Sequence, residues 1–166
     1  MEGIQRTHPG DFEVGPGTQI PPTPLPARWQ RRPTVIVVED DVEMRSLLTW
    51  ALRRAGYRVV AFANGDDALT WLGPGALDGE VERVPSAIVC DIRIPYFSGL
   101  EILASLRLAA ERIPTILITA LPDEETRREA ARLGATCLLE KPFALEALCQ
   151  AVSRAVATPR RGEECR

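Results

Sequence analysis

The fold is decided by the stretch Ile88-Val89-Cys90-Asp91-Ile92-Arg93-Ile94-Pro95-Tyr96-Phe97-Ser98-Gly99-Leu100. A short apolar run ends here in a single carboxylate, and a Pro and a Gly follow before a new apolar helix begins. Such runs are typical of buried strands in parallel sheets, which bind ligands just beyond the carboxyl ends of their strands. Asp91 therefore occupies a position suited to chemistry, although an Asp after a strand can also cap a helix or begin a turn.

The segments on both sides of this stretch alternate between β-branched runs and amphipathic runs. Strands are predicted at residues 34–38, 58–62, 87–90, 115–119 and about 136–140. Helices are predicted from Met44 to a stop at Gly56, and at residues 66–72, 99–110, 122–134 and about 145–157. Five strands alternating with five helices call for a parallel sheet with right-handed crossovers. The prediction is a doubly wound α/β domain over residues 33–157, with helices on both faces of a five-stranded sheet.

The remaining residues carry no such pattern. Residues 1–32 are rich in proline and are expected to form a flexible leader, and residues 158–166 form a short charged tail. An irregular, turn-rich stretch at residues 73–82 is longer than a connection of this kind needs, and could serve a partner. No output domain follows, so we expect a stand-alone domain.

Composition excludes several classes of function. The 166 residues carry 20 basic and 23 acidic side chains, and a net charge of −3 gives no general attraction to nucleic acid or anionic lipid. No apolar run approaches the length of a membrane span, and the N-terminus lacks the pattern of a signal peptide. We therefore expect a cytoplasmic protein that binds neither membrane nor nucleic acid directly.

Polar side chains follow four of the predicted strands, and the carboxyl ends of parallel strands lie along one edge of a sheet. They are Glu39-Asp40-Asp41, Asp91, Thr119 and Lys141. Several carboxylates close together need a cation to stay ionised, and hard oxygen ligands beside a phosphoryl group suit Mg²⁺. Each residue also has a structural explanation: an acidic first helical turn, a strand-end threonine and a solvated lysine. Their joint occurrence at consecutive strand ends favours a site.

Residues 34–156 resemble the receiver domain of bacterial two-component response regulators. The motifs that carry the resemblance are Val37-Val38-Glu39-Asp40-Asp41, Asp91 with Pro95 and Gly99, Thr119-Ala120, and Lys141-Pro142-Phe143, in the order and spacing of that family. The resemblance implies the flavodoxin-like strand order 2-1-3-4-5.

The resemblance also implies how the residues act. Asp91 matches the aspartate that accepts a phosphoryl group from a kinase phosphohistidine. Asp40 matches the residue that binds Mg²⁺ directly, Glu39 matches its partner that acts through water, and the backbone carbonyl of Arg93 matches a further metal ligand.

Two further matches concern the switch. Thr119 matches the hydroxyl that moves toward the phosphoryl group, and Lys141 matches the lysine that pairs with it, in a Lys141-Pro142 peptide expected to be cis. One departure is Leu138. Receivers often carry an aromatic residue at this position, and its side chain turns inward behind the threonine on phosphorylation. This chain lacks that aromatic side chain.

The function predicted is that of a phosphorylation-gated binding module. The expected partners are a histidine kinase or phosphotransfer protein, and then a downstream protein or a second copy bound through the face of helix 4, strand 5 and helix 5 of the receiver. Two alternatives stay open. A receiver that is never phosphorylated would act as a constitutive adaptor. A haloacid-dehalogenase-like phosphatase also uses Asp, Mg²⁺, Thr and Lys, but it places its nucleophile after the first strand and a second Asp two residues on, where this chain has Arg93.

Overall fold

The structure is a computed structural model that describes residues 32–73, 84–109 and 111–157. The predicted leader and tail and the 73–82 insertion lie almost entirely outside the described residues, so those predictions stay untested. The described residues contain one five-stranded parallel sheet of order β2-β1-β3-β4-β5, which confirms the predicted fold class and strand order.

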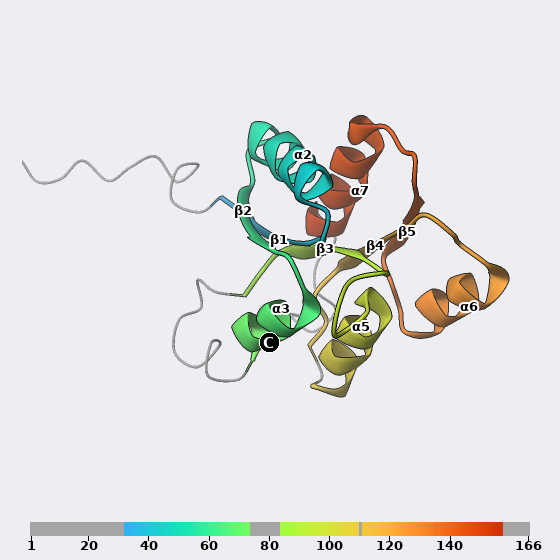
Figure 1. Cartoon of the computed structure of the whole chain (residues 1–166). Helices are drawn as coiled ribbons and strands as arrows, with labels where there is room; N and C mark the ends of the chain where they lie inside the picture. Colours follow the sequence, from blue (N-terminus) through green and yellow to red (C-terminus); the bar gives the residue numbers. More distant parts are fainter. Residues whose placement is uncertain (1–31, 74–83, 110, 158–166) are drawn as a thin grey trace, which may run out of the picture. The chain divides into compact units, whose positions relative to one another are not determined.

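The sequence of strands and helices is also as predicted (Figure 1). The strands are β1 (Thr34–Val38), β2 (Arg58–Phe62), β3 (Ala87–Asp91), β4 (Thr115–Thr119) and β5 (Cys137–Glu140). The helices are α2 (Val42–Arg54), α3 (Gly65–Leu72), α5 (Gly99–Leu108), α6 (Glu124–Arg132) and α7 (Leu145–Ala157).

Alternate residues of the central strands supply the cores on the two faces of the sheet. Val35 and Val37 of β1 lie in one apolar cluster together with residues of α2 and α7, whereas Ile36 and Val38 lie in a second cluster together with residues of α3, α5 and α6. The three central strands β1, β3 and β4 are buried along their whole length. This burial on both faces explains why their sequences are nearly continuous apolar runs.

Local signals set the ends of the helices. Gly56 and Gly134 follow α2 and α6 with φ angles of 97° and 75°, a backbone conformation that other residues adopt only with strain. One predicted boundary is wrong: α6 begins at Glu124 and not at Pro122. The reason is that the Asp123 side chain accepts a hydrogen bond from the Thr126 N–H, which makes Asp123 the N-cap and leaves Pro122 outside the helix. Within the described residues no helix is long and apolar enough to span a membrane.

A single arginine fastens the end of α6 to α5. Nε and Nη2 of Arg107 donate to the carbonyl oxygens of Leu133 and Gly134, each at 3.0 Å, and Nη1 donates to the carbonyl of Glu111 at 2.8 Å. Only Ala130 of α6 is buried, so apolar packing holds this helix weakly. The guanidinium therefore supplies a substantial part of the attachment of α6.

Candidate functional site

Three polar side chains are buried where neighbouring strands end. Glu39 directly follows β1, Asp91 ends β3 and Thr119 ends β4, with exposed fractions of 1%, 6% and 1%. In the sheet register Asp91 pairs with Ile118, which places Thr119 one residue further along the adjacent strand. Buried polar groups are costly unless they are paired, so these three positions need a structural or functional explanation.

Lys141, which follows β5, bridges the two buried carboxylates. Its Nζ donates to Oε2 of Glu39 at 2.8 Å and also to Oδ2 of Asp91. The exposed fractions of the Lys141, Glu39 and Asp91 side chains are 19%, 2% and 8%. The three predicted site residues thus lie together, although Glu39 and Lys141 are 102 positions apart in the chain.

Burial and pairing compete in setting the protonation of this group. Burial raises the pKa of the Glu39 carboxyl, and the hydrogen bond from Lys141 opposes that rise only in part. Burial also lowers the pKa of the Lys141 ammonium, but its bonds to Asp91 and Glu39 outweigh burial and leave this pKa above its ordinary value. Lys141 is therefore a cation that faces two acids. When both Glu39 and Asp91 are ionised, these three side chains together carry one uncompensated negative charge.

The loop after β3 holds the Asp91 carboxylate from its other side. The backbone N–H of Arg93 donates to Oδ1 of Asp91 at 2.7 Å. The loop then returns so closely that a Cβ on Gly99 would lie 2.6 Å from the Asp91 carbonyl oxygen, a distance that no side chain tolerates. Gly99 is the first residue of α5, and Ser98 caps this helix in a capping box with Glu101. Gly99 therefore allows the loop between β3 and α5 to pack closely against the end of β3.

Thr119 is connected to Lys141 by a backbone hydrogen bond. Its Oγ1 accepts a hydrogen bond from the Leu121 N–H at 3.2 Å, and its carbonyl oxygen accepts one from the Lys141 N–H at 2.8 Å. A movement of Thr119 would therefore act both on the segment before α6 and on the strand end that carries Lys141.

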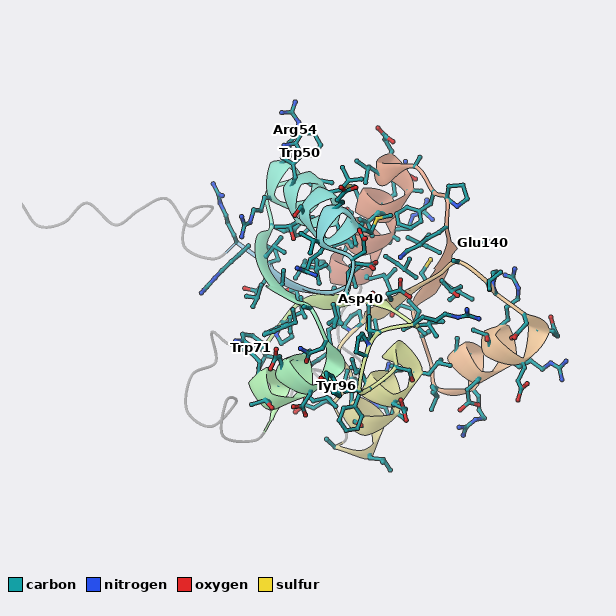
Figure 2. All side chains as sticks on the ribbon, viewed as in Figure 1. Asp40, Trp50, Arg54, Trp71, Tyr96 and Glu140 are labelled. Carbon is teal, nitrogen blue, oxygen red and sulfur yellow. The ribbon has the colours of Figure 1, made fainter. Side chains whose placement is uncertain are left out.

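The acidic run after β1 divides into different roles. Asp41 is the N-cap of α2 and its Oδ1 accepts from the Met44 N–H at 2.7 Å, as expected for an acidic helix start. Asp40, which is labelled in Figure 2, is exposed. Sequence reasoning missed Arg45, whose Nη1 donates to the carbonyls of Glu39 at 2.7 Å and Asp40 at 3.0 Å. An arginine one helical turn after an acidic run is the signal that could have revealed this contact.

The oxygen donors at this edge fit Mg²⁺ by their chemistry. Carboxylates of Glu39, Asp40 and Asp91 and a backbone carbonyl are hard ligands of the kind that Mg²⁺ takes in small number together with water. The described residues do not, however, contain a group of three acidic, His or Cys side chains close enough to hold a metal. Lys141 lies between Glu39 and Asp91 and supplies the positive charge there. The predicted magnesium site thus stays a prediction.

Two further expectations concern residues around the site. The Lys141-Pro142 peptide is cis, as predicted. Leu138 pairs with Leu117 in the sheet and packs, half buried, against the cluster that α3, α5 and α6 cover. A leucine therefore lies beside the core where an aromatic side chain was expected from the resemblance.

Comparison with known proteins agrees with this geometry. The family model described as the response regulator receiver domain matches residues 35–153. Nodulation protein W of Bradyrhizobium diazoefficiens is 36% identical over 130 residues, which cover 78% of this chain and 54% of that protein. The alkaline phosphatase synthesis transcriptional regulatory protein SphR of Synechococcus elongatus is 29% identical over 152 residues, which cover 89% of this chain and 57% of that protein. The chain thus spans about half the length of these two relatives.

A solved structure agrees as well. The crystal structure of the chemotaxis protein CheY4 of Vibrio cholerae is similar to this structure, with a TM-score of 0.64 and 27% sequence identity. The match covers 75% of this chain and 99% of the CheY4 chain.

Proposed function

The chain belongs to the response regulator receiver domain family, and on this premise we propose that it accepts a phosphoryl group on Asp91. Receiver domains are signalling domains that interact with histidine kinases and with effector domains. The observation that supports Asp91 as the acceptor is its placement: it is buried, held at Oδ1 by the Arg93 N–H and paired at Oδ2 with Lys141. A carboxylate held at both oxygens is oriented for attack before a donor arrives.

The proposed transfer is a single displacement at phosphorus. An Asp91 carboxylate oxygen forms a bond to the phosphorus of a phosphohistidine as the phosphorus–nitrogen bond breaks, and the departing imidazole nitrogen takes a proton from water. The Lys141 ammonium and the Thr119 hydroxyl donate to phosphoryl oxygens. Asp40, Asp91 and the Arg93 carbonyl would hold Mg²⁺, with Glu39 acting through water. The ion would neutralise charge on the transferring group.

The response proposed starts at the two residues that contact the phosphoryl group. When Lys141 turns from Glu39 toward the new oxygens and Thr119 follows, the ends of β4 and β5 shift. Arg127 of α6 is paired with Glu140 of β5 at 3.2 Å, so this shift reaches the surface formed by α6, β5 and α7. We propose that a downstream protein, or a second copy, binds on that face. Since Leu138 replaces the aromatic reporter, the displacement of α6 itself would carry the signal.

The decisive experiment is intact-mass spectrometry of the full chain after incubation with a small phosphodonor and Mg²⁺. We expect one phosphoryl group on the wild type, and its loss in Asp91→Asn and on chelation of the metal. Asp67→Asn, an exposed aspartate at the start of α3, is the matched control and should be modified normally. A wild type that gains no phosphoryl group would instead favour the constitutive adaptor. Turnover of phosphate esters would favour the phosphatase.

A further inference from the structure

Arg45, near the start of α2, makes contacts that the proposed function does not yet explain. Its Nη1 donates to the carbonyl oxygen of Glu39 at 2.7 Å and to that of Asp40 at 3.0 Å. These two acids belong to the turn that connects β1 to α2. Arg45 is half buried, and a single guanidinium nitrogen holds two consecutive peptide groups of the turn. The backbone of this acidic turn is therefore fixed by one side chain.

The contacts of Arg45 also show on which side of the turn the guanidinium lies. The peptide bond between Asp40 and Asp41 is trans, so its carbonyl and its N–H point in opposite directions. The carbonyl accepts from Arg45, whereas the N–H donates to Oε1 of Glu39 at 3.4 Å. Arg45 and the Glu39 carboxylate thus lie on opposite sides of this peptide group. The arginine holds the turn without pairing with the Glu39 side chain, which accepts from Lys141 instead.

Asp40 differs from the neighbouring acids in having a side chain that is still available to a ligand. Glu39 and Asp91 both accept from Lys141. Asp41 is the N-cap of α2. No hydrogen bond or ion pair from the part of the chain that the structure describes reaches the exposed Asp40 carboxylate. The direction of this carboxylate therefore depends on the backbone of the turn, and the backbone is what Arg45 holds.

We propose that Arg45 is a positioning residue for the divalent cation: by holding the carbonyls of Glu39 and Asp40, it fixes the direction of the Asp40 carboxylate and raises the affinity of the site for Mg²⁺. This inference rests on the proposed function, in which Asp40, Asp91 and the Arg93 carbonyl hold the ion. Arg45 itself makes no contact with the ion in this proposal. Removal of a residue that orients a metal ligand typically lowers metal affinity about 10–100-fold.

The positive charge of Arg45, taken alone, predicts the opposite effect on the metal. A guanidinium near a cation site repels the cation, so its removal would strengthen the binding of Mg²⁺. Loss of positioning weakens the binding instead. A side chain that only stabilises the fold would change the stability of the protein and leave the metal affinity unchanged. The sign of the change in affinity therefore distinguishes the three roles.

Isothermal titration calorimetry of the full chain with MgCl₂, at constant ionic strength and without a phosphodonor, tests this proposal. Arg45→Met should raise the dissociation constant for Mg²⁺ at least about tenfold. Arg45→Lys keeps a nitrogen donor on a shorter side chain and should recover part of this loss.

Arg53→Met is the matched control. Arg53 lies on the same helix and donates to the carbonyl of Val59 at 3.5 Å, so this change removes the same charge and a contact of the same kind. It lies eight residues further along α2, about 12 Å from Arg45 and beyond the distance at which salt screens exposed charges. We therefore expect the affinity of Arg53→Met for Mg²⁺ to equal that of the wild type.

Three results would overturn the proposal. Equal affinities of the wild type and Arg45→Met would leave Arg45 a structural role only, and the proposed phosphorylation of Asp91 would be unaffected. Tighter binding by Arg45→Met would show that the arginine acts through its charge. A wild type that binds no Mg²⁺ would refute both this inference and the magnesium site of the proposed function. A native circular dichroism spectrum of each variant shows that it is folded, and Arg45→Gln, with the same expected loss, replaces Arg45→Met if that variant does not fold.

Discussion

Replacement of Lys141 by Met should be one of the most destabilising single changes at the strand ends. The ammonium is the cation that pairs with both Glu39 and Asp91, and the side chains of these acids are 2% and 8% exposed. Without it, two buried carboxylates face each other unpaired. Removing one partner of a buried ion pair costs about 3–5 kcal/mol, and the partial exposure of Lys141 points to about 3 kcal/mol. The midpoint of thermal unfolding should fall by roughly 6–12 °C.

The assay is urea unfolding at neutral pH in a buffer with chelator, so that no divalent cation substitutes for the ammonium. Arg127→Met is the control. It removes one member of the exposed Arg127–Glu140 pair, whose side chains are 49% and 58% exposed, and it should lower the free energy of unfolding by less than about 0.5 kcal/mol.

A double-mutant cycle isolates the electrostatic part of the effect. Asp91→Asn leaves a hydrogen-bonding side chain but removes one of the two acids, so it should recover about 1–2 kcal/mol of the loss in Lys141→Met. If Lys141→Met unfolds at the same urea concentration as the wild type, or if Asp91→Asn adds to its cost, the buried carboxylates are not held by the lysine and this account of the site is wrong.

The other predictions concern the segments that position the site. Gly99→Ala should cost about 2 kcal/mol in urea unfolding and slow phosphorylation, because its Cβ would press on the Asp91 carbonyl from 2.6 Å; a rate equal to wild type would contradict this. Arg107→Met should cost about 2 kcal/mol through three lost carbonyl contacts, and hydrogen exchange should rise selectively in α6, whereas a uniform rise would show only global destabilisation. Ser98→Ala should cost about 1 kcal/mol, with Ser98→Asp restoring most of it; equal losses in both would mean that the cap does not stabilise α5.

The arrangement of the sheet and the identity of the strand-end residues could be predicted from local pattern. The apolar runs ending at Val38, Asp91 and Thr119 are short and lie between turn residues, so period and length suffice to recognise them as buried strands. Parallel order then brings their ends to one edge. Glu39, Asp91 and Lys141 meet there as expected, since this follows from topology alone.

The contacts of Arg107 could not be predicted in this way. Arg107 contacts carbonyls 26 and 27 positions further along the chain, and nothing in the local sequence distinguishes it from other helical arginines. The start of α6 also cannot be fixed by the sequence, because Pro122 and Asp123 are both residue types that favour a helix start. Only the observed bond from the Thr126 N–H to Asp123 decides between them. Whether Glu39 and Asp91 pair with Lys141 or bind a metal also depends on side-chain positions that the spacing of residues does not specify.

Lys141 has a further consequence that follows from the composition of the chain around it. It is the only lysine in the sequence, since the other residues among the 20 Lys and Arg are all arginine. Lysine-selective isotope enrichment would therefore give a spectrum with a single ammonium resonance, and that resonance would come from the group paired with Glu39 and Asp91. The protein thus contains its own spectroscopic probe, which needs no chemical tag and would report the arrival of a phosphodonor or a metal ion beside Glu39 and Asp91.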